Sequence, residues 1–196
     1  MKFQHAESPS RSDPTVTLTP RFAVLAGLIA FAVGERLVVH FVPGLIPYNF
    51  TPVEAIALFG GAYFADRRLA IMVPLAAMLL ADLIIGLHAL IPVVYGCIAL
   101  TAIVAARLRG RTSVMRVATY GVASATLFFA VTNFAVWATS GMYPLTGAGL
   151  VACFVAAIPF FPGTLAGTLF WSALLFGGFE LMCRQWPALE AAPNAT

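Results

Sequence analysis

Long uninterrupted runs of apolar residues constrain this chain more than any other feature. They dominate a sequence of 196 residues in which 61% are hydrophobic and only 10% are charged. Soluble domains carry about 25% charged residues, and a helix needs ~20 apolar residues to cross a ~30 Å hydrocarbon core. The runs therefore predict an all-α, polytopic integral membrane protein. They exclude an outer-membrane barrel, because its strands would alternate apolar and polar residues.

The runs predict six transmembrane helices, at residues 22–42, 52–65, 69–87, 89–107, 114–139 and 163–183. In the second, Thr51 would be the N-cap and Pro52 the first helical residue. Residues 147–183 are too long for one crossing, and Pro159 and Pro162 divide them into a hydrophobic segment at 147–158 and the sixth span. Polar residues 1–21 and 184–196 are expected to be a disordered cytoplasmic tail and a cytoplasmic C-terminal tail, without a cleaved signal peptide.

Charge placement predicts the orientation of the six spans. If the N-terminus is inside, ten of the eleven basic residues fall in cytoplasmic segments and only Arg36 lies toward the outside. The ten are Lys2, Arg11, Arg21, Arg67, Arg68, Arg107, Arg109, Arg111, Arg116 and Arg184. Cytoplasmic loops of membrane proteins are enriched in Lys and Arg. We therefore expect both termini to be cytoplasmic.

Several functions are excluded by missing residues. The sequence has no GxxxxGK[ST] loop, so the chain would not hydrolyse ATP itself. Its only lysine is Lys2, in the polar tail, which excludes a retinal Schiff base within the membrane. The cysteines Cys97, Cys153 and Cys183 have no paired spacing and predict no disulfide framework.

In this orientation, most polar residues of the spans fall at one depth, toward the outside. The set is Glu35, Arg36, His40, Glu54, Asp82, His88, Tyr95, Cys97, Asn133 and Trp137. Ionisable groups within a span cost ~2.5–3.5 kcal/mol each unless they pair or line a wet cavity. They therefore predict either an outward-facing substrate pocket or an ion pair of Arg36 with Glu35 or Asp82 that only joins helices. Near the inner side, Glu180 is expected to pair with Arg184.

Two uncharged connections, at residues 41–50 and 141–162, flank these polar groups on the outer side. Both are rich in aromatic residues, Pro and Gly. One interpretation makes them lids over a largely apolar ligand, with Tyr48, Asn49 and Tyr143 in contact with it. The alternative is interfacial anchoring by an aromatic belt.

Several short strings give the sequence a resemblance to a known family. Residues 49–52 read NFTP and residues 132–137 read TNFAVW, and Ala26 and Ala30 form an AxxxA pair. With residues 58–62, 82–88 and 157–161, they resemble an uncharacterised bacterial family of transport proteins related to the S-components of energy-coupling factor (ECF) vitamin transporters. The resemblance implies an S-component-like bundle that is not an enzyme, with an outward pocket under loop lids. It also implies that Ala26 and Ala30 dock on a coupling subunit whose partner ATPases hydrolyse ATP.

The favoured ligand of this resemblance is cobalamin, carried as a substrate and not as a cofactor. Solitary S-component-like proteins that import cobalamin use a pocket residue as an axial cobalt ligand, and His88 and Cys97 are candidates for that role, with His40 at the same depth. Two alternatives remain open. The chain could be a haem-bearing redox protein with His40 and His88 as axial ligands, or an intramembrane enzyme using Glu35, Glu54, Asp82 and His88 as acid–base groups.

Overall fold

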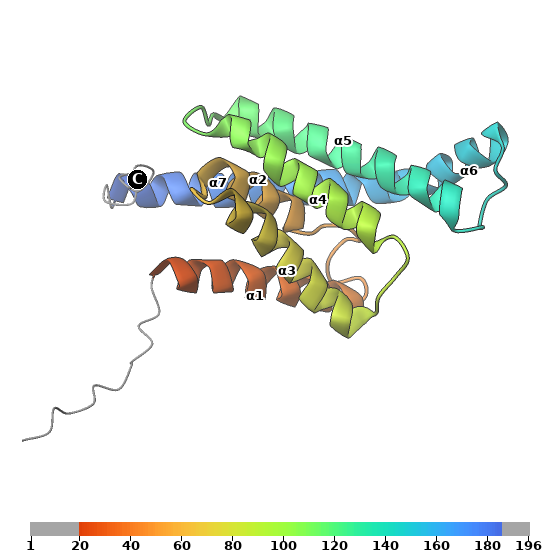
Figure 1. Cartoon of the computed structure of the whole chain (residues 1–196), viewed down its shortest axis with the longest axis horizontal. Coiled ribbons are helices and arrows are strands. Elements are labelled where there is room, and N and C mark those ends of the chain that lie inside the picture. Colours follow the sequence, from red (N-terminus) through yellow and green to blue (C-terminus); the bar gives the residue numbers. More distant parts are fainter. Residues whose placement is uncertain (1–19, 186–196) are drawn as a thin grey trace, which may run out of the picture.

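The computed structural model describes residues 20–185, and this part of the chain is helical with short connections (Figure 1). In chain order the elements are α1 (Pro20–Phe41), α2 (Val53–Tyr63), α3 (Arg67–Ile85), α4 (Ile91–Ala105), η1 (Ala106–Leu108), α5 (Val114–Thr139), α6 (Gly147–Ala157), η2 (Ile158–Phe160) and α7 (Phe161–Gln185). The predicted tails at 1–21 and 184–196 lie outside the described residues, apart from 20–21 and 184–185, which belong to α1 and α7.

Most of these helices have the composition of membrane spans. Five helical stretches are long and apolar enough to cross a bilayer: Val24–Phe41, Arg67–Ile85, Ile91–Leu108, Val114–Thr139 and Gly147–Gln185. The protein is therefore a helical membrane protein, as the apolar runs predict. The exception is α2, whose 11 residues extend only about 16 Å, roughly half of the hydrocarbon thickness.

Helix α2 lies at the centre of the bundle. Every residue from Val53 to Ala62 is buried, against α3, α4, α5 and α7. A Cβ atom on Gly61 would lie 2.3 Å from the carbonyl oxygen of Ala102, so the backbones of α2 and α4 are in direct contact. Side chains of α2 contribute to both hydrophobic cores, Ile56 to the one beside α1 and α3 and Phe59 to the one beside α5 and α7.

The free backbone groups at the two ends of α2 find different hydrogen-bond partners. At the first, the helix begins at Val53 with Pro52 as its N-cap, one residue later than predicted, and Thr51 Oγ1 lies a distant 3.5 Å from the backbone N–H of Val53. At the other, Arg109 donates from Nε to the Gly61 carbonyl at 2.9 Å and from Nη2 to the Phe64 carbonyl at 2.6 Å. A cation at this end also complements the helix dipole.

The segments α6, η2 and α7 form one apolar stretch of 39 residues that bends at its prolines. Pro159 lies within η2 and Pro162 in the first turn of α7. The bend falls where the sequence predicts it, because proline cannot donate the backbone hydrogen bond of a continuous helix. Both α6 and α7 pack on α5 (Figure 1).

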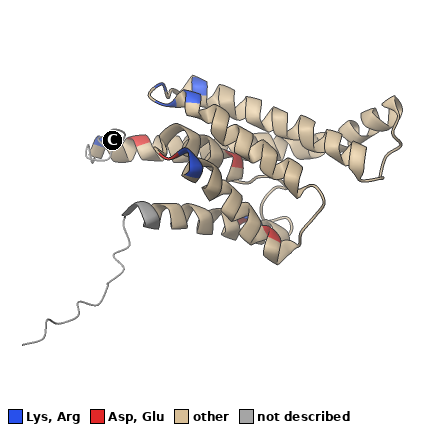
Figure 2. Ribbon diagram, viewed as in Figure 1, with Lys and Arg blue, Asp and Glu red and all other residues tan. Residues whose placement is uncertain are grey.

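The first residue of α1 and the last of α7 lie at the same end of the bundle (Figure 1). Arginines of the α2–α3 and α4–α5 connections gather there too (Figure 2). At that end Arg184 Nη2 is 2.9 Å from Glu180 Oε1, which confirms the predicted pair. Because both side chains are exposed, the pair contributes little to stability.

Candidate functional site

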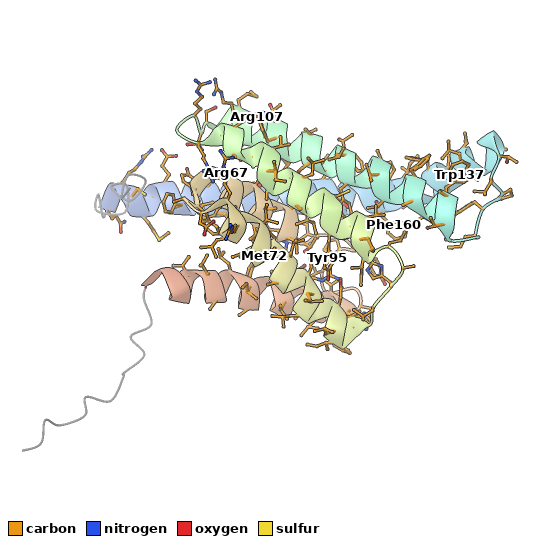
Figure 3. All side chains as sticks on the ribbon, in the orientation of Figure 1. Arg67, Met72, Tyr95, Arg107, Trp137 and Phe160 are labelled. Carbon is orange, nitrogen blue, oxygen red and sulfur yellow. The ribbon has the colours of Figure 1, made fainter. Side chains whose placement is uncertain are left out.

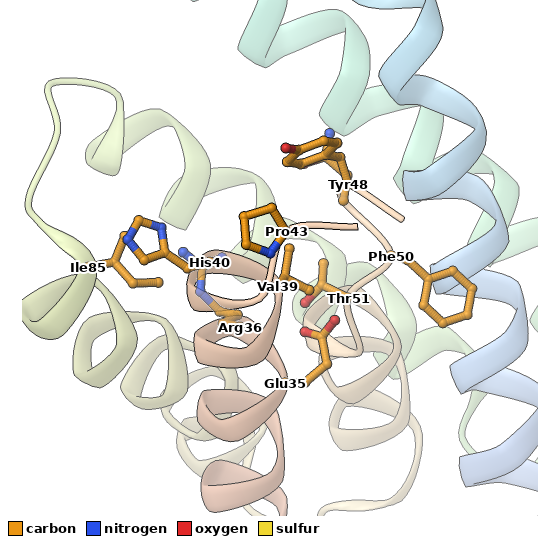
Figure 4. Close-up of a pocket in the computed structure, with 10 residues that line it drawn as sticks. Glu35, Arg36, Val39, His40, Pro43, Tyr48, Phe50, Thr51 and Ile85 are labelled. Carbon is orange, nitrogen blue, oxygen red and sulfur yellow. The ribbon is translucent and has the colours of Figure 1, made fainter. Parts of the chain in front are cut away.

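A cavity of about 400 Å³ lies at the opposite end of α1, beneath the connection between α1 and α2 (Figure 4). It falls within the range of small-molecule sites, ~300–1,000 Å³. The last turns of α1, the loop at residues 42–52 and the end of α3 form its walls. The lining residues are Glu35, Arg36, Val39, His40, Pro43, Tyr48, Asn49, Phe50, Thr51 and Ile85.

The loop at 42–52 is packed against α7 by two glycines. A Cβ atom on Gly163 would lie 2.0 Å from the carbonyl oxygen of Tyr48, and one on Gly167 would lie 2.9 Å from Cα of Phe50. The Phe50 ring also packs on Phe170 and Trp171, at centroid distances of 5.5 and 5.9 Å. The wall that this loop gives to the cavity is therefore held by α7.

Arg36, in the cavity floor, belongs to a hydrogen-bonded network that joins three helices. Arg36 Nη2 on α1 donates to Asp82 Oδ1 on α3 at 2.7 Å, and Tyr95 OH on α4 donates to Asp82 Oδ2 at 2.9 Å. The Asp82 side chain is only 1% exposed, whereas that of Arg36 is 22% exposed and faces the cavity. Of the predicted partners of Arg36, the structure selects Asp82, so Arg36 both joins α1 to α3 and forms part of the cavity wall.

Glu35 is the other ionisable residue at the bottom of the cavity. It is 7% exposed, and its carboxylate points toward Thr51 (Figure 4). The Thr51 hydroxyl lies near the carboxylate, but within the described part of the chain neither oxygen has a well-formed hydrogen bond. Burying a carboxylate without hydrogen-bond donors is unfavourable in free energy, so a group that donates hydrogen bonds to Glu35 would stabilise this position.

Glu54 occupies a separate buried position and does not line the cavity. It lies in the first turn of α2, is 4% exposed, and faces the hydroxyls of Thr101 on α4 and Ser124 on α5 without a well-formed hydrogen bond. Cys97 lies beside it, also buried. The predicted pocket residue Glu54 is thus part of the bundle interior in this structure.

The two predicted cobalt ligands are not brought to the cavity. His88 is exposed in the connection between α3 and α4, and Cys97 is buried beside Glu54. Only His40 lines the cavity. Residues 20–185 contain no group of three or more His, Cys, Asp or Glu side chains placed to hold a metal ion. A cobalt ion could therefore have only a single protein ligand here, and its other ligands would have to come from the corrin ring.

Three further predicted residues lie away from the cavity. Asn133 Nδ2 donates to the carbonyl of Phe129 on its own helix at 2.7 Å. Trp137 Nε1 donates to the carbonyl of Pro144 at 3.0 Å, at the end of α5 and well separated from Tyr95 (Figure 3). Tyr143 belongs to the same turn and is half-buried. The Trp137 hydrogen bond ties the end of α5 to the α5–α6 connection, and none of residues 141–162 lines the cavity.

A second hollow, of about 380 Å³, lies between α5 and α6. Its lining consists of Phe129, Leu150, Val151, Phe154, Val155 and Ile158. It offers no polar side chain to orient a ligand, whereas specific sites combine apolar walls with a few placed polar groups. The cavity beside α1 is therefore the stronger candidate site.

The sequence does not identify the apolar and hydroxyl residues that line the cavity. Val39, Pro43, Phe50, Thr51 and Ile85 line it but are not among the predicted site residues. A helical spacing signal exists for Val39, which follows Glu35 by one turn. The contribution of Ile85 depends on how α3 packs against α1, which one sequence does not show.

Comparison with known proteins places the chain in a family. Residues 16–189 match the family described as "Family of unknown function (DUF6580)". The chain belongs to this family. The match covers every described helix, so the cavity and the Arg36–Asp82–Tyr95 network lie within the part that defines DUF6580. No curated protein matches the chain, and no solved structure matches it.

Proposed function

We propose that this protein is a membrane uptake component that binds a vitamin-sized molecule in the cavity beside α1 and releases it to the cytoplasm. The observation that carries the proposal is the cavity itself, about 400 Å³ in volume, with Glu35 and Arg36 at its floor and Tyr48 and Phe50 in its wall. A few charged groups among apolar walls are typical of sites for small organic molecules. The chain would act by binding and not by catalysis.

The proposed orientation has six crossings with both termini in the cytoplasm of a bacterial inner membrane. It is supported by the arginines gathered at the end of the bundle opposite the cavity (Figure 2), since basic residues favour the cytoplasmic side. In this orientation α2 and the loop at 42–52 together form the second crossing. Non-helical backbone is tolerated at membrane depth where protein covers it or it lines a cavity.

The proposed energy source is a separate ATP-driven coupling module of the ECF type, which would dock on α1. Ala26 and Ala30 are exposed, and α1 packs mainly on α3, which leaves much of its surface uncovered. Small residues let a partner helix approach closely. Co-expression with a coupling module should give a complex that A26L/A30L weakens, while A123L, at an exposed alanine of α5, should leave it intact. Equal recovery of both variants would contradict docking at this face.

Cobalamin is the substrate that the sequence predicts, and its absorption spectrum makes the prediction testable. The cavity volume of about 400 Å³ favours a molecule smaller than a corrinoid, and His40 is the candidate ligand at its wall. An absorption spectrum of gently purified protein, followed by native mass spectrometry, tests the proposal directly. Corrinoid bands would support cobalamin. Another bound small molecule would support uptake of a different ligand, and recovery of protein with no ligand under any growth condition would count against the proposed function.

The same spectrum tests one of the two alternatives. A Soret band would favour a haem protein, although His40 lines the cavity and His88 does not. The acid–base enzyme has less support, because Glu35, Glu54 and His88 occupy three different environments in the fold. A general acid and base must both reach the reacting group, within about 3 Å or through one water.

A further inference from the structure

The charge balance of the cavity beside α1 narrows the class of ligand that it takes. Among the described residues that line it, Glu35, Arg36 and His40 have ionisable side chains. Arg36 is already paired, since its Nη2 lies 2.7 Å from Asp82 Oδ1. Tyr95 OH donates a hydrogen bond to the other carboxylate oxygen of Asp82, Oδ2, at 2.9 Å. The positive charge of Arg36 is thus balanced within the protein, and the charge of Glu35 is not.

Glu35 also lacks a well-formed hydrogen bond, although the Thr51 hydroxyl lies near its carboxylate. The residue is 7% exposed, and among the described residues neither carboxylate oxygen has a hydrogen-bond partner. Its side chain lies at the bottom of the cavity, below Thr51 and the loop that carries Tyr48 (Figure 4). A carboxylate removed from water is stabilised only by donors or by a positive charge beside it.

The remaining walls suit the organic part of a cation. Val39, Pro43 and Ile85 are aliphatic, and Tyr48 adds an aromatic ring, whereas the ring of Phe50 is turned toward α7 (Figure 4). An ammonium group near an aromatic face gains a cation–π attraction. The volume of about 400 Å³ and these walls do not suit a bare metal ion, which needs several ligands close together.

We infer that the cavity binds a small organic cation with a primary or secondary ammonium group, whose N–H donors reach Glu35. The inference rests on the proposed function, because it names the ligand class of the same cavity. Charge-assisted hydrogen bonds between ammonium and carboxylate are about twice as strong as neutral ones. They would supply both the donors and the charge that Glu35 lacks.

Three probes of similar shape test the inference on the full-length protein in detergent. 2-Phenylethylamine is a cation at neutral pH, 2-phenylethanol is its neutral counterpart, and 3-phenylpropanoate is an anion. Binding is measured by calorimetry and by the shift in thermal unfolding. The amine is expected to bind at least tenfold more tightly than the alcohol, and the carboxylate to bind least.

Two variants then identify the partner of the ammonium group. Glu35→Gln should reduce the affinity for the amine at least tenfold and leave the affinity for the alcohol nearly unchanged. Glu180→Gln is the matched control, since it removes an exposed carboxylate at the other end of the bundle and should bind as the wild type does. If Glu35→Gln does not fold, the ranking of the three probes on the wild-type protein still decides the ligand class.

The failures of the inference and of the proposed function are distinguishable. Equal affinity for amine and alcohol, or an unchanged amine affinity in Glu35→Gln, would overturn the cation assignment while leaving a small-molecule cavity. If no probe binds, the charge of any co-purified molecule decides the class, and an anion or a neutral molecule overturns the inference. If no probe binds and no molecule co-purifies, both the inference and the proposed function fail.

Discussion

Arg36 and Asp82 are 46 positions apart in the sequence, yet Arg36 Nη2 and Asp82 Oδ1 lie 2.7 Å apart and join α1 to α3. The two sides of this pair differ in environment, because Asp82 is 1% exposed and Arg36 borders the cavity. A structural ion pair and a binding-site residue are therefore not exclusive interpretations of Arg36. The pair holds one wall of the cavity in place and balances the charge of the arginine.

Breaking this pair from one side should destabilise the protein strongly. Arg36→Met leaves Asp82 buried without its cation, which typically costs ~3–5 kcal/mol. The double variant Arg36→Met/Asp82→Leu removes both charges and should regain much of that loss. Unfolding in mixed micelles with increasing SDS measures both free energies. A single variant as stable as the wild type would show that the pair contributes nothing to the fold.

Glu54 should tolerate loss of its charge better than loss of its side chain. Glu54→Gln keeps the shape and adds donors beside the hydroxyls of Thr101 and Ser124, so we expect stability equal to or above the wild type. Glu54→Ala should lose ~1–3 kcal/mol through the space that it leaves at a residue only 4% exposed. Thermal unfolding of the two variants checks the order. A Gln variant that loses as much stability relative to the wild type as the Ala variant does would mean that Glu54 needs its charge.

The contact of α2 with α4 should be sensitive to a single methyl group. In Gly61→Ala the new Cβ would meet the Ala102 carbonyl oxygen, and forcing the helices apart should cost ~1–3 kcal/mol. Gly96→Ala on α4 is the matched control, because nothing lies within 4 Å of its Cβ position. It should be neutral or slightly stabilising, since alanine favours helix. Equal melting temperatures for both variants would argue against the close approach.

The support of the cavity wall by α7 predicts a loss of binding from a residue outside the cavity. Gly167→Ala would place a Cβ 2.9 Å from both Cα of Phe50 and N of Thr51, displacing the loop. We expect a five- to fiftyfold weaker affinity, roughly 1–2.3 kcal/mol, for whichever molecule the cavity binds. Gly177→Ala, on the same helix with nothing within 4 Å, should bind normally. Unchanged binding by Gly167→Ala would show that the position of the loop at 42–52 does not affect the affinity of the site.

The sequence predicts the helices well because several apolar runs begin or end at a strong local signal. Pro159 and Pro162 mark the bend before α7, and Asp66 and Ser113 cap α3 and α5 by accepting from the backbone N–H of Arg68 and Arg116. These signals act between near neighbours, so one sequence contains them. The interior position of α2 depends instead on packing against α3, α4, α5 and α7, which local signals do not reveal.

The sequence predicts the depth of the candidate site but only part of its lining. Glu35, Arg36, His40, Tyr48 and Asn49 were all expected in the pocket and all line the cavity. Glu54, His88, Asn133, Trp137 and Tyr143 share the predicted depth but lie elsewhere. Residues at equal depth can face different sides of a bundle, and the packing of α1 against α3 decides which of them meet.

The burial of α2 also matters for any account of how this chain is threaded through a bilayer. Five stretches of residues 20–185 are long and apolar enough to cross, and an odd number of crossings would put the start of α1 and the end of α7 on opposite faces of a membrane. The start of α1 and the end of α7 lie instead at one end of the bundle (Figure 1), which agrees with the proposed additional crossing by α2 and its loop. In the six-crossing topology proposed above, the shortest and most buried segment would therefore set the parity of the fold, and with it the compartment that every later loop faces.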